Sequence, residues 1–324
     1  MDPREFTRAP TISGIDTQGD RLSIDYSENL INVLVFFDPV SCHSLEAIEA
    51  IQLLSLQYEK LSVCFWFIME PRPSCMYKSE IAQRTLNRLG LFSKAIYDVN
   101  NQIGLNFGLV DVPTVLIVDS NSFIRLKFEG DIAFREVERA IQARLAVSGY
   151  KVELPELGEA DIDLPHLHST SVMKQLGYGA NDYVLNSMVV PEANQEFILP
   201  NLYFSHAVYP LGDWYVGRDY MEGKNGSTVY VSCGSEESVY LFAGSEEGAL
   251  LRIHTSIGSH HRLVFGREVE NRDGLISLKV SEFRPYEVLS CAGDSMISLQ
   301  VMDGSLKLYT VEFCPLNQLV AINH

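Results

Sequence analysis

VLVFFDPVSCHSL, residues 33–45, is the stretch of the sequence that decides the fold. Its first five residues, 33–37, form a continuous apolar run, which is typical of a β-strand buried on both faces of a sheet. From Cys42 to Tyr58, apolar residues recur every three or four positions and predict an amphipathic α-helix. A short turn therefore joins a buried strand to a helix whose first turn contains a cysteine.

The rest of the first 148 residues continues this alternation of strands and helices, which predicts an α/β domain. The turn DSNS at 119–122 separates two strands of a hairpin. The predicted elements are a small hairpin at 11–24, a buried strand at 63–69, helices at 79–89 and 99–107, hairpin strands at 114–118 and 124–128, and a last helix at 132–146.

The composition changes after this first domain. Residues 149–196 contain three prolines and a cluster of acidic side chains, so we interpret them as an acidic connector, with a short helix near 169–176. From 197 to 324, short strand candidates follow one another between turns, and one such turn is expected at 302–304. This pattern predicts an all-β, jelly-roll-like sandwich as the second domain.

Charge and hydropathy exclude several classes of protein. The 324 residues contain 25 Lys and Arg against 42 Asp and Glu, a net charge of −17. Nucleic acids and anionic membranes attract basic patches, so we predict neither as a partner. The apolar stretches are strand-sized, and MDPREFTRAP at the start lacks a signal-peptide core. We expect a soluble protein, cytoplasmic as written, and extracytoplasmic if a native N-terminal anchor was removed.

Cys42 is the strongest candidate for chemistry. At the first turn of a helix, backbone N–H groups carry partial positive charge that favours the thiolate. Pro113 directly precedes the strand at 114–118, a setting in which a cis-proline leaves neighbouring main chain exposed. A reactive thiol and a retained but inactive cysteine both agree with these residues.

The stretch 33–45 resembles the active-site segment of TlpA-like thioredoxin-family proteins, the redoxins. APTI at 9–12 resembles that family's N-terminal hairpin, and VPTVLIVD at 112–119 resembles its cis-proline strand. GDWYVG at 212–217 and LKLYTVEF at 306–313 resemble DipZ-type proteins. The resemblance implies a thioredoxin-like domain followed by a carbohydrate-binding-module-like β-sandwich.

The sequence departs from the family motif CxxC, because it has CHSL at 42–45. A dithiol enzyme releases its mixed disulfide with the second cysteine, and Leu45 cannot do this. The resemblance therefore implies a monothiol site in which Cys42 attacks. Cys75, which follows the strand at 63–69, is a candidate resolving thiol beside an external thiol such as glutathione. The implied substrate-binding residues are Ser41, His43, Val112 and Pro113.

Two functions stay open. The first is an atypical thiol–disulfide oxidoreductase that forms mixed disulfides with proteins or small thiols and uses no cofactor or metal. The second is a catalytically inactive thioredoxin-like interaction protein whose β-sandwich binds a glycan or a protein partner. Trp214 and Tyr215 are then the candidate glycan platform, with core packing as the alternative role for these rings.

Overall fold

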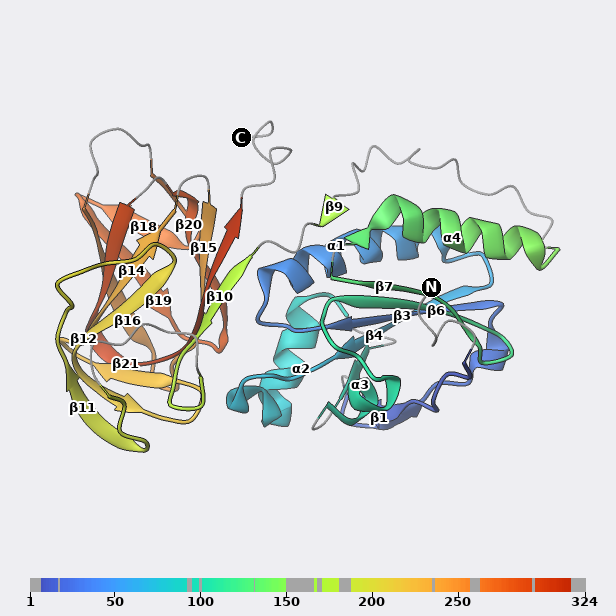
Figure 1. Cartoon of the computed structure of the whole chain (residues 1–324), viewed down its shortest axis with the longest axis horizontal. Helices are drawn as coiled ribbons and strands as arrows, with labels where there is room; N and C mark the ends of the chain where they lie inside the picture. The colour runs from blue at the N-terminus through green and yellow to red at the C-terminus, as the bar shows by residue number, and fades with distance from the viewer. Residues whose placement is uncertain are drawn as a thin grey trace. The chain divides into compact units, whose positions relative to one another are not determined.

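The computed structural model describes residues 7–16, 18–91, 95–98, 101–130, 132–149, 166–167, 171–180, 188–234, 237–256, 263–292 and 295–315. The chain divides into two compact units, Met1–Ser169 and Thr170–His324 (Figure 1). The division falls inside the stretch 149–196, in which we expected the connector.

Unit 1 is built on a seven-stranded sheet with the order β2-β1-β5-β4-β3-β6-β7. β3 pairs with β4, and β4 with β5, as parallel neighbours, whereas β6 and β7 are antiparallel. Every residue of β3 and β4 is buried, because these central strands are covered on both faces. The strands are β1 (Ser13–Ile15), β2 (Arg21–Ser23), β3 (Ile31–Phe37), β4 (Val63–Met69), β5 (Ala95–Tyr97), β6 (Thr114–Asp119) and β7 (Ile124–Glu129).

The α-helices in the described part of unit 1 are α1 (Cys42–Tyr58), α2 (Ser79–Arg88), α3 (Gln102–Phe107) and α4 (Phe134–Val147). α1 and α4 lie on the same side of the sheet (Figure 1). A polar contact joins them, because the hydroxyl of Tyr58 donates to Glu138 Oε1 at 3.2 Å and accepts from Gln142 Nε2 at 2.8 Å. On the other face, Phe107 of α3 packs against Phe36 of β3. No helix among the described residues is long and apolar enough to span a membrane.

Unit 2 contains only strands among its described elements, and their pairings join all 12 into one hydrogen-bonded sheet that β12 and β21 divide into two parts, here called its two sheets. One part has the order β11-β12-β13-β21-β15-β20-β17, with β10 also on β21, and the other contains β14, β16, β19 and β18 beside β12 and β21. Its strands are β10 (Val172–Gln175), β11 (Ala193–Phe197), β12 (Ala207–Val216), β13 (Met221–Lys224), β14 (Thr228–Cys233), β15 (Glu237–Gly244), β16 (Ala249–Ser256), β17 (Val264–Phe265), β18 (Val269–Arg272), β19 (Leu275–Val280), β20 (Arg284–Ala292) and β21 (Ser295–Pro315).

Two long strands connect the sheets of unit 2. β12 pairs with β14 as far as Leu211 and with β11 from Gly212 onward. β21 pairs with β16 as far as Gly304 and with β13 from Ser305 onward. Both glycines have positive φ, 80° and 75°, which side chains rarely tolerate. Each strand therefore bends at a glycine and passes from one sheet to the other.

The predicted order of an α/β domain followed by an all-β domain is confirmed. The short helix expected near 169–176 is wrong, because 172–175 form β10 and pair with β21. β11 likewise places residues 193–196 of the expected connector among the paired strands of unit 2. The turn expected at 302–304 lies inside β21, since the bend at Gly304 continues the strand. The three-residue strand β5 was too short for the pattern to reveal.

Candidate functional site

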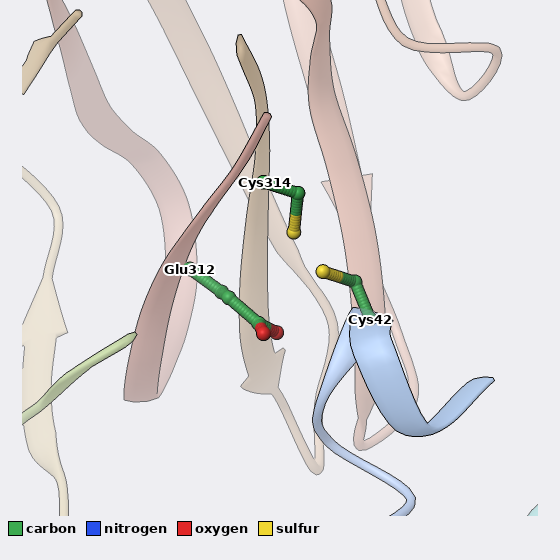
Figure 2. A group of neighbouring side chains, drawn as sticks. All are labelled: Cys42, Glu312 and Cys314. Atoms are coloured by element: carbon green, nitrogen blue, oxygen red, sulfur yellow. The ribbon is translucent and has the colours of Figure 1, made fainter. Parts of the chain in front are cut away.

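Cys42 is the first residue of α1 (Figure 2). The helix begins there because Ser41 is its N-cap: its backbone is extended, and its hydroxyl accepts the N–H of Ser44 at 3.4 Å. The hydroxyl of Ser44 in turn accepts the N–H of Asp38 at 3.1 Å, which fixes the turn that follows β3. No acidic side chain lies in the first turn of α1. Glu46 is one turn after Cys42, and burial, with the charge of Glu49, raises its pKa to about 7, which reduces the negative charge that it places near a thiolate at Cys42.

His43 links the start of α1 to the loop after β7. Its Nε2 lies 3.2 Å from the carbonyl oxygen of Gly130, and since a carbonyl only accepts, Nε2 carries the proton. The N–H of Gly130 donates to the carbonyl oxygen of Pro113 at 3.1 Å. The Val112–Pro113 peptide bond is cis. Gly130 thus connects the residue after Cys42 to the proline before β6.

The backbone N–H groups of the segment before Pro113 donate hydrogen bonds to carboxylate side chains. The N–H groups of Val110 and Asp111 both donate to Glu129 Oε1 at 3.1 Å, and the N–H of Val112 donates to Asp111 Oδ1 at 2.8 Å. Burial raises the pKa of Glu129, but hydrogen bonds from Lys127 and the two N–H groups outweigh it and hold that pKa below its ordinary value. Glu129 is therefore ionised and fixes the loop at neutral pH.

Three carboxylates directly follow the three parallel strands of unit 1. Asp38 follows β3, Glu70 follows β4 and Asp98 follows β5, so all lie at the same edge of the sheet. The side chains of Asp38 and Asp98 are each 1% exposed. Asp98 accepts the N–H groups of Ile103 and Gly104 at 2.9 Å, at the start of α3.

Burial raises the pKa of all three carboxyl groups. The pKa of Asp38 rises to about 6, although Arg72 lowers it in part. The pKa of Glu70 rises to about 7 through burial and the neighbouring charges of Asp98 and Asp38, again with a smaller opposing effect of Arg72. The pKa of Asp98 is also raised by burial. This edge of the sheet therefore binds and releases protons near neutral pH.

Arg72 contacts two carboxylates at this edge of the sheet. Its Nε lies 3.4 Å from Asp38 Oδ2, and its Nη2 lies 4.0 Å from Asp111 Oδ1. Five charged residues at or near this edge were not predicted as site residues from the sequence: Arg72, Asp38, Glu70, Asp98 and Asp111. Positions immediately after predicted parallel strands were the signal that would have found Asp38 and Glu70, because such positions share one edge.

The other described cysteines are spread over both units. Cys64 lies in β4, Cys75 in the 3-10 helix Ser74–Tyr77 and Cys233 at the end of β14, and each is buried and outside a disulfide. Burial, with the charge of Glu237, raises the pKa of the Cys233 thiol to about 12, so this thiol is unreactive. Cys75 stays a prediction as the resolving thiol.

Figure 2 also labels Cys314 on β21, together with Glu312 two residues earlier, and the two side chains lie on the same side of the strand. Phe313 between them packs into the core of unit 2. The alternation of a strand thus turns the Cys314 thiol away from that core. Within each unit taken alone, no three described His, Cys, Asp or Glu residues bring their ligand atoms within 4.8 Å of one another.

Trp214 and Tyr215 lie on opposite faces of β12. Trp214 is 1% exposed in the core of unit 2, and its Nε1 donates to the carbonyl oxygen of Leu211 at 3.2 Å. Its ring is therefore not available to a sugar, which corrects its place in the predicted platform. Tyr215 points outward, donates its hydroxyl to Glu192 and has its ring 6.2 Å from that of Tyr220.

The sheet order of unit 1, the capped helix start at Cys42 and the cis-proline before β6 define a thioredoxin-like domain. No protein-family model matches the chain, and no curated protein matches it. Among solved structures, a conserved protein from Geobacillus kaustophilus is 16% identical with a TM-score of 0.40, over 48% of this chain and 88% of that one.

Two thiol-disulfide oxidoreductases are also similar to part of the chain. The thioredoxin domain of one from Bacteroides vulgatus is 15% identical with a TM-score of 0.36, over 42% of this chain and 97% of that one. One from Bacteroides fragilis is 16% identical with a TM-score of 0.36, over 42% of this chain and 98% of that one. The assignment of the fold rests on the topology of unit 1.

Proposed function

We propose that this chain is an atypical thiol–disulfide oxidoreductase whose nucleophile is Cys42. The observation that carries the proposal is the position of Cys42 at a capped helix start, which Gly130 links to the cis Val112–Pro113 bond. Backbone N–H groups at a helix start stabilise a thiolate, and the thiolate is the form that attacks disulfides.

The reaction requires one protein thiol and an external thiol. The Cys42 thiolate attacks one sulfur of a substrate disulfide, the S–S bond breaks, and the other sulfur leaves as a thiolate that takes a proton from water. A small thiol such as glutathione then attacks the Cys42 sulfur of the mixed disulfide and releases the second substrate thiol. A second small thiol regenerates the Cys42 thiolate and leaves as an oxidised disulfide. Leu45 explains why the external thiol is needed, since it cannot replace a second cysteine.

The substrate lies beside the cis-proline in this proposal. Val112 precedes β6, outside the pairing that begins with Thr114, so an extended chain adds beside Pro113 through main-chain hydrogen bonds to Val112. Ser41 and His43 lie at the start of α1, on the other side of the Gly130 link. His43 orients the loop through its Nε2–H bond, and the hydroxyl of Ser41 caps the helix that carries the thiol.

Alkylation of Cys42 as a function of pH tests the proposal. In the full chain, after reduction, we expect the iodoacetamide rate to report a pKa below the ordinary thiol value of about 8.5. Reduction of hydroxyethyl disulfide by glutathione should depend on the protein, disappear in Cys42→Ser and persist in the matched variant Cys75→Ser. An ordinary thiol pKa together with no Cys42-dependent reduction would end the oxidoreductase interpretation. Loss of activity in Cys75→Ser would instead make Cys75 the resolving thiol.

A cluster of tyrosines favours the second candidate function, a glycan- or protein-binding sandwich of the jelly-roll, carbohydrate-binding-module type in a DipZ-like arrangement. Hydrogen bonding to Glu192 raises the pKa of Tyr215 to about 12 and also raises that of Tyr178, so two hydroxyls share one carboxylate. Tyr220 packs beside Tyr215. Rings next to a hydrogen-bonding carboxylate suit the faces and hydroxyls of sugars.

A glycan array probed with the labelled full chain tests this candidate. We expect binding that disappears in Tyr215→Ala and persists in Tyr203→Ala, which removes a tyrosine that is 40% exposed and outside the cluster. A chain that binds no glycan on the array, or whose binding survives Tyr215→Ala, would contradict the candidate.

A further inference from the structure

The loop before the cis-proline satisfies its own backbone donors. Val110, Asp111 and Val112 precede β6 and stand outside its ladder of hydrogen bonds. The first two N–H groups donate to Glu129, whereas the N–H of Val112 donates to Oδ1 of the preceding residue, Asp111, at 2.8 Å. A side chain of the loop itself therefore occupies the donor closest to Pro113.

The two carboxylates that accept from this loop, Glu129 at the end of β7 and Asp111 in the loop itself, are held differently. Lys127 Nζ lies 2.5 Å from Glu129 Oε2, and the Lys127 side chain is only 7% exposed, so Glu129 is fixed. The side chain of Asp111 is 55% exposed, and its bond to Val112 joins neighbours in sequence. Rotation of the Asp111 side chain is therefore enough to release the N–H of Val112 without moving the backbone.

Arg72 lies close enough to Asp111 to bind its carboxylate after that side chain has left Val112. Its Nη2 lies 4.0 Å from Asp111 Oδ1, while its Nε is held 3.4 Å from Asp38 Oδ2, a carboxylate that is 1% exposed. The contact with Asp38 thus holds the guanidinium group through Nε, and Nη2 of the same group faces Asp111. This distance is measured to the same Oδ1 that accepts from Val112, so the attraction of Arg72 acts on the bonded carboxylate and continues to act on it after it leaves Val112.

This donor lies close to the segment that carries the thiol. Phe36 of β3 lies opposite Thr114 of β6, and Arg72 contacts both Asp38, which follows β3, and Asp111, which precedes Val112. Asp38 precedes Cys42 by four residues. A chain that pairs with Val112 therefore runs past the segment that carries Cys42.

We propose that Asp111 is a specificity residue that competes with an extended substrate chain for the N–H of Val112. This inference rests on the proposed function, in which such a chain binds beside Pro113. A polypeptide carbonyl replaces the Asp111 carboxylate on Val112, and Arg72 receives the displaced side chain. A small disulfide without a peptide backbone makes no such exchange, so Asp111 affects polypeptide substrates alone.

The test measures peptide binding without redox chemistry. In the full Cys42→Ser chain, the Val112 amide is followed by NMR while a blocked hexapeptide of alternating valine and threonine is added. One hydrogen bond contributes about 1 kcal/mol, so we expect Asp111→Ala to lower the dissociation constant about fivefold and to speed hydrogen exchange at Val112. Asp111→Asn keeps an acceptor oxygen and should stay within about twofold of the parent, as should the exposed control Glu80→Ala.

The outcomes separate this inference from the proposed function. Equal dissociation constants for Asp111→Ala and its parent, or a Val112 amide that the peptide shifts in neither chain, overturns the role of Asp111. An Asp111→Asn chain that behaves like Asp111→Ala also overturns it, because the acceptor oxygen then has no effect. The proposed function is tested apart from these, by reaction of intact Cys42 with hydroxyethyl disulfide, which carries no peptide backbone.

Discussion

The Nε2 of His43 and the carbonyl oxygen of Gly130 lie 3.2 Å apart, although 87 residues separate them in the sequence. Because the N–H of Gly130 also donates to Pro113, one residue is bonded to the helix that carries Cys42 and to the cis-proline loop. Two consecutive hydrogen bonds therefore hold the start of α1, which carries Cys42, in a fixed position relative to the cis-proline loop.

Replacing His43 by alanine should loosen this arrangement. The carbonyl of Gly130 loses its donor, and we expect the free energy of unfolding of unit 1 to fall by about 1 kcal/mol. Trp66 and Trp214 are the two tryptophans of the chain, one in each unit, so Trp66 fluorescence in a Trp214→Phe background reports urea unfolding of unit 1. His254→Ala, an exposed position on β16, is the control. Equal unfolding midpoints for both variants would contradict the role of the His43 bond.

The buried carboxylates predict that unit 1 is more stable at pH 5 than at pH 8. The pKa of Asp38 rises to about 6 and that of Glu70 to about 7 on folding, so between the unfolded and folded pKa values the native state binds more protons. The free energy of unfolding therefore falls as the pH rises through these values. Each shift exceeds one pKa unit, which corresponds to about 1.4 kcal/mol, so we expect a loss of about 1 kcal/mol or more per group.

Glu70→Gln separates this effect from the general charge of the chain. The glutamine amide does not titrate, so the difference in urea midpoint between pH 5 and pH 8, followed by Trp66 fluorescence, should shrink. Glu80→Gln removes an exposed carboxylate of α2 and should leave the difference unchanged. A Glu70→Gln chain with the full pH dependence would show that Glu70 does not take up a proton on folding.

Short-range sequence patterns were enough to predict α1 and the position of Cys42 in it. The raised pKa values of the nearby carboxyl groups could not be predicted, because they depend on how the strands pair in the folded sheet. The apolar period of α1 and the serine before Cys42 are encoded within 20 residues, and the helix begins at the predicted position. The raised pKa of Glu70 comes first from burial and then from the charges of Asp98 and Asp38, which the pairing of three strands brings to one edge. Each carboxylate by itself looks in the sequence like an ordinary loop residue.

The feature hardest to predict was which face of a strand is buried. Because side chains alternate along β12, Trp214 and Tyr215 must point to opposite sides, but the side that forms the core depends on which strands pack against β12. That sheet depends on β12 and β21 each passing through a bend at a glycine, so the burial of Trp214 follows from contacts far away in the sequence. A strand prediction alone could not assign Trp214 to the core.

Leu45→Cys should restore the missing half of the motif. Position 45 is one turn after Cys42 on α1, so a thiol there reaches the Cys42 sulfur and resolves a mixed disulfide within the protein. We expect the release of substrate from the trapped Cys42 adduct to become independent of glutathione concentration, measured by the rate at which a fluorescent thiol leaves. Leu45→Ala, which changes the size of the side chain without adding a thiol, should keep the glutathione dependence. The same dependence in Leu45→Cys would contradict the monothiol interpretation of the site.

Gly304→Ala tests the bend by which β21 connects the two sheets of unit 2. Both Gly304 and Gly226 have positive φ, 75° and 95°, so alanine at either position costs about 1 kcal/mol in backbone conformation. A Cβ at Gly304 would also collide with the backbone carbonyl oxygen of Gly248, whereas a Cβ at Gly226 has open space around it. We expect Gly226→Ala to lower the free energy of unfolding of unit 2 by about 1 kcal/mol and Gly304→Ala by several times as much, since β16 must move away from β21. Urea unfolding followed by Trp214 in a Trp66→Phe background measures both. Equal losses would mean that the bend tolerates a side chain and that close approach of Gly248 is not what requires glycine at position 304.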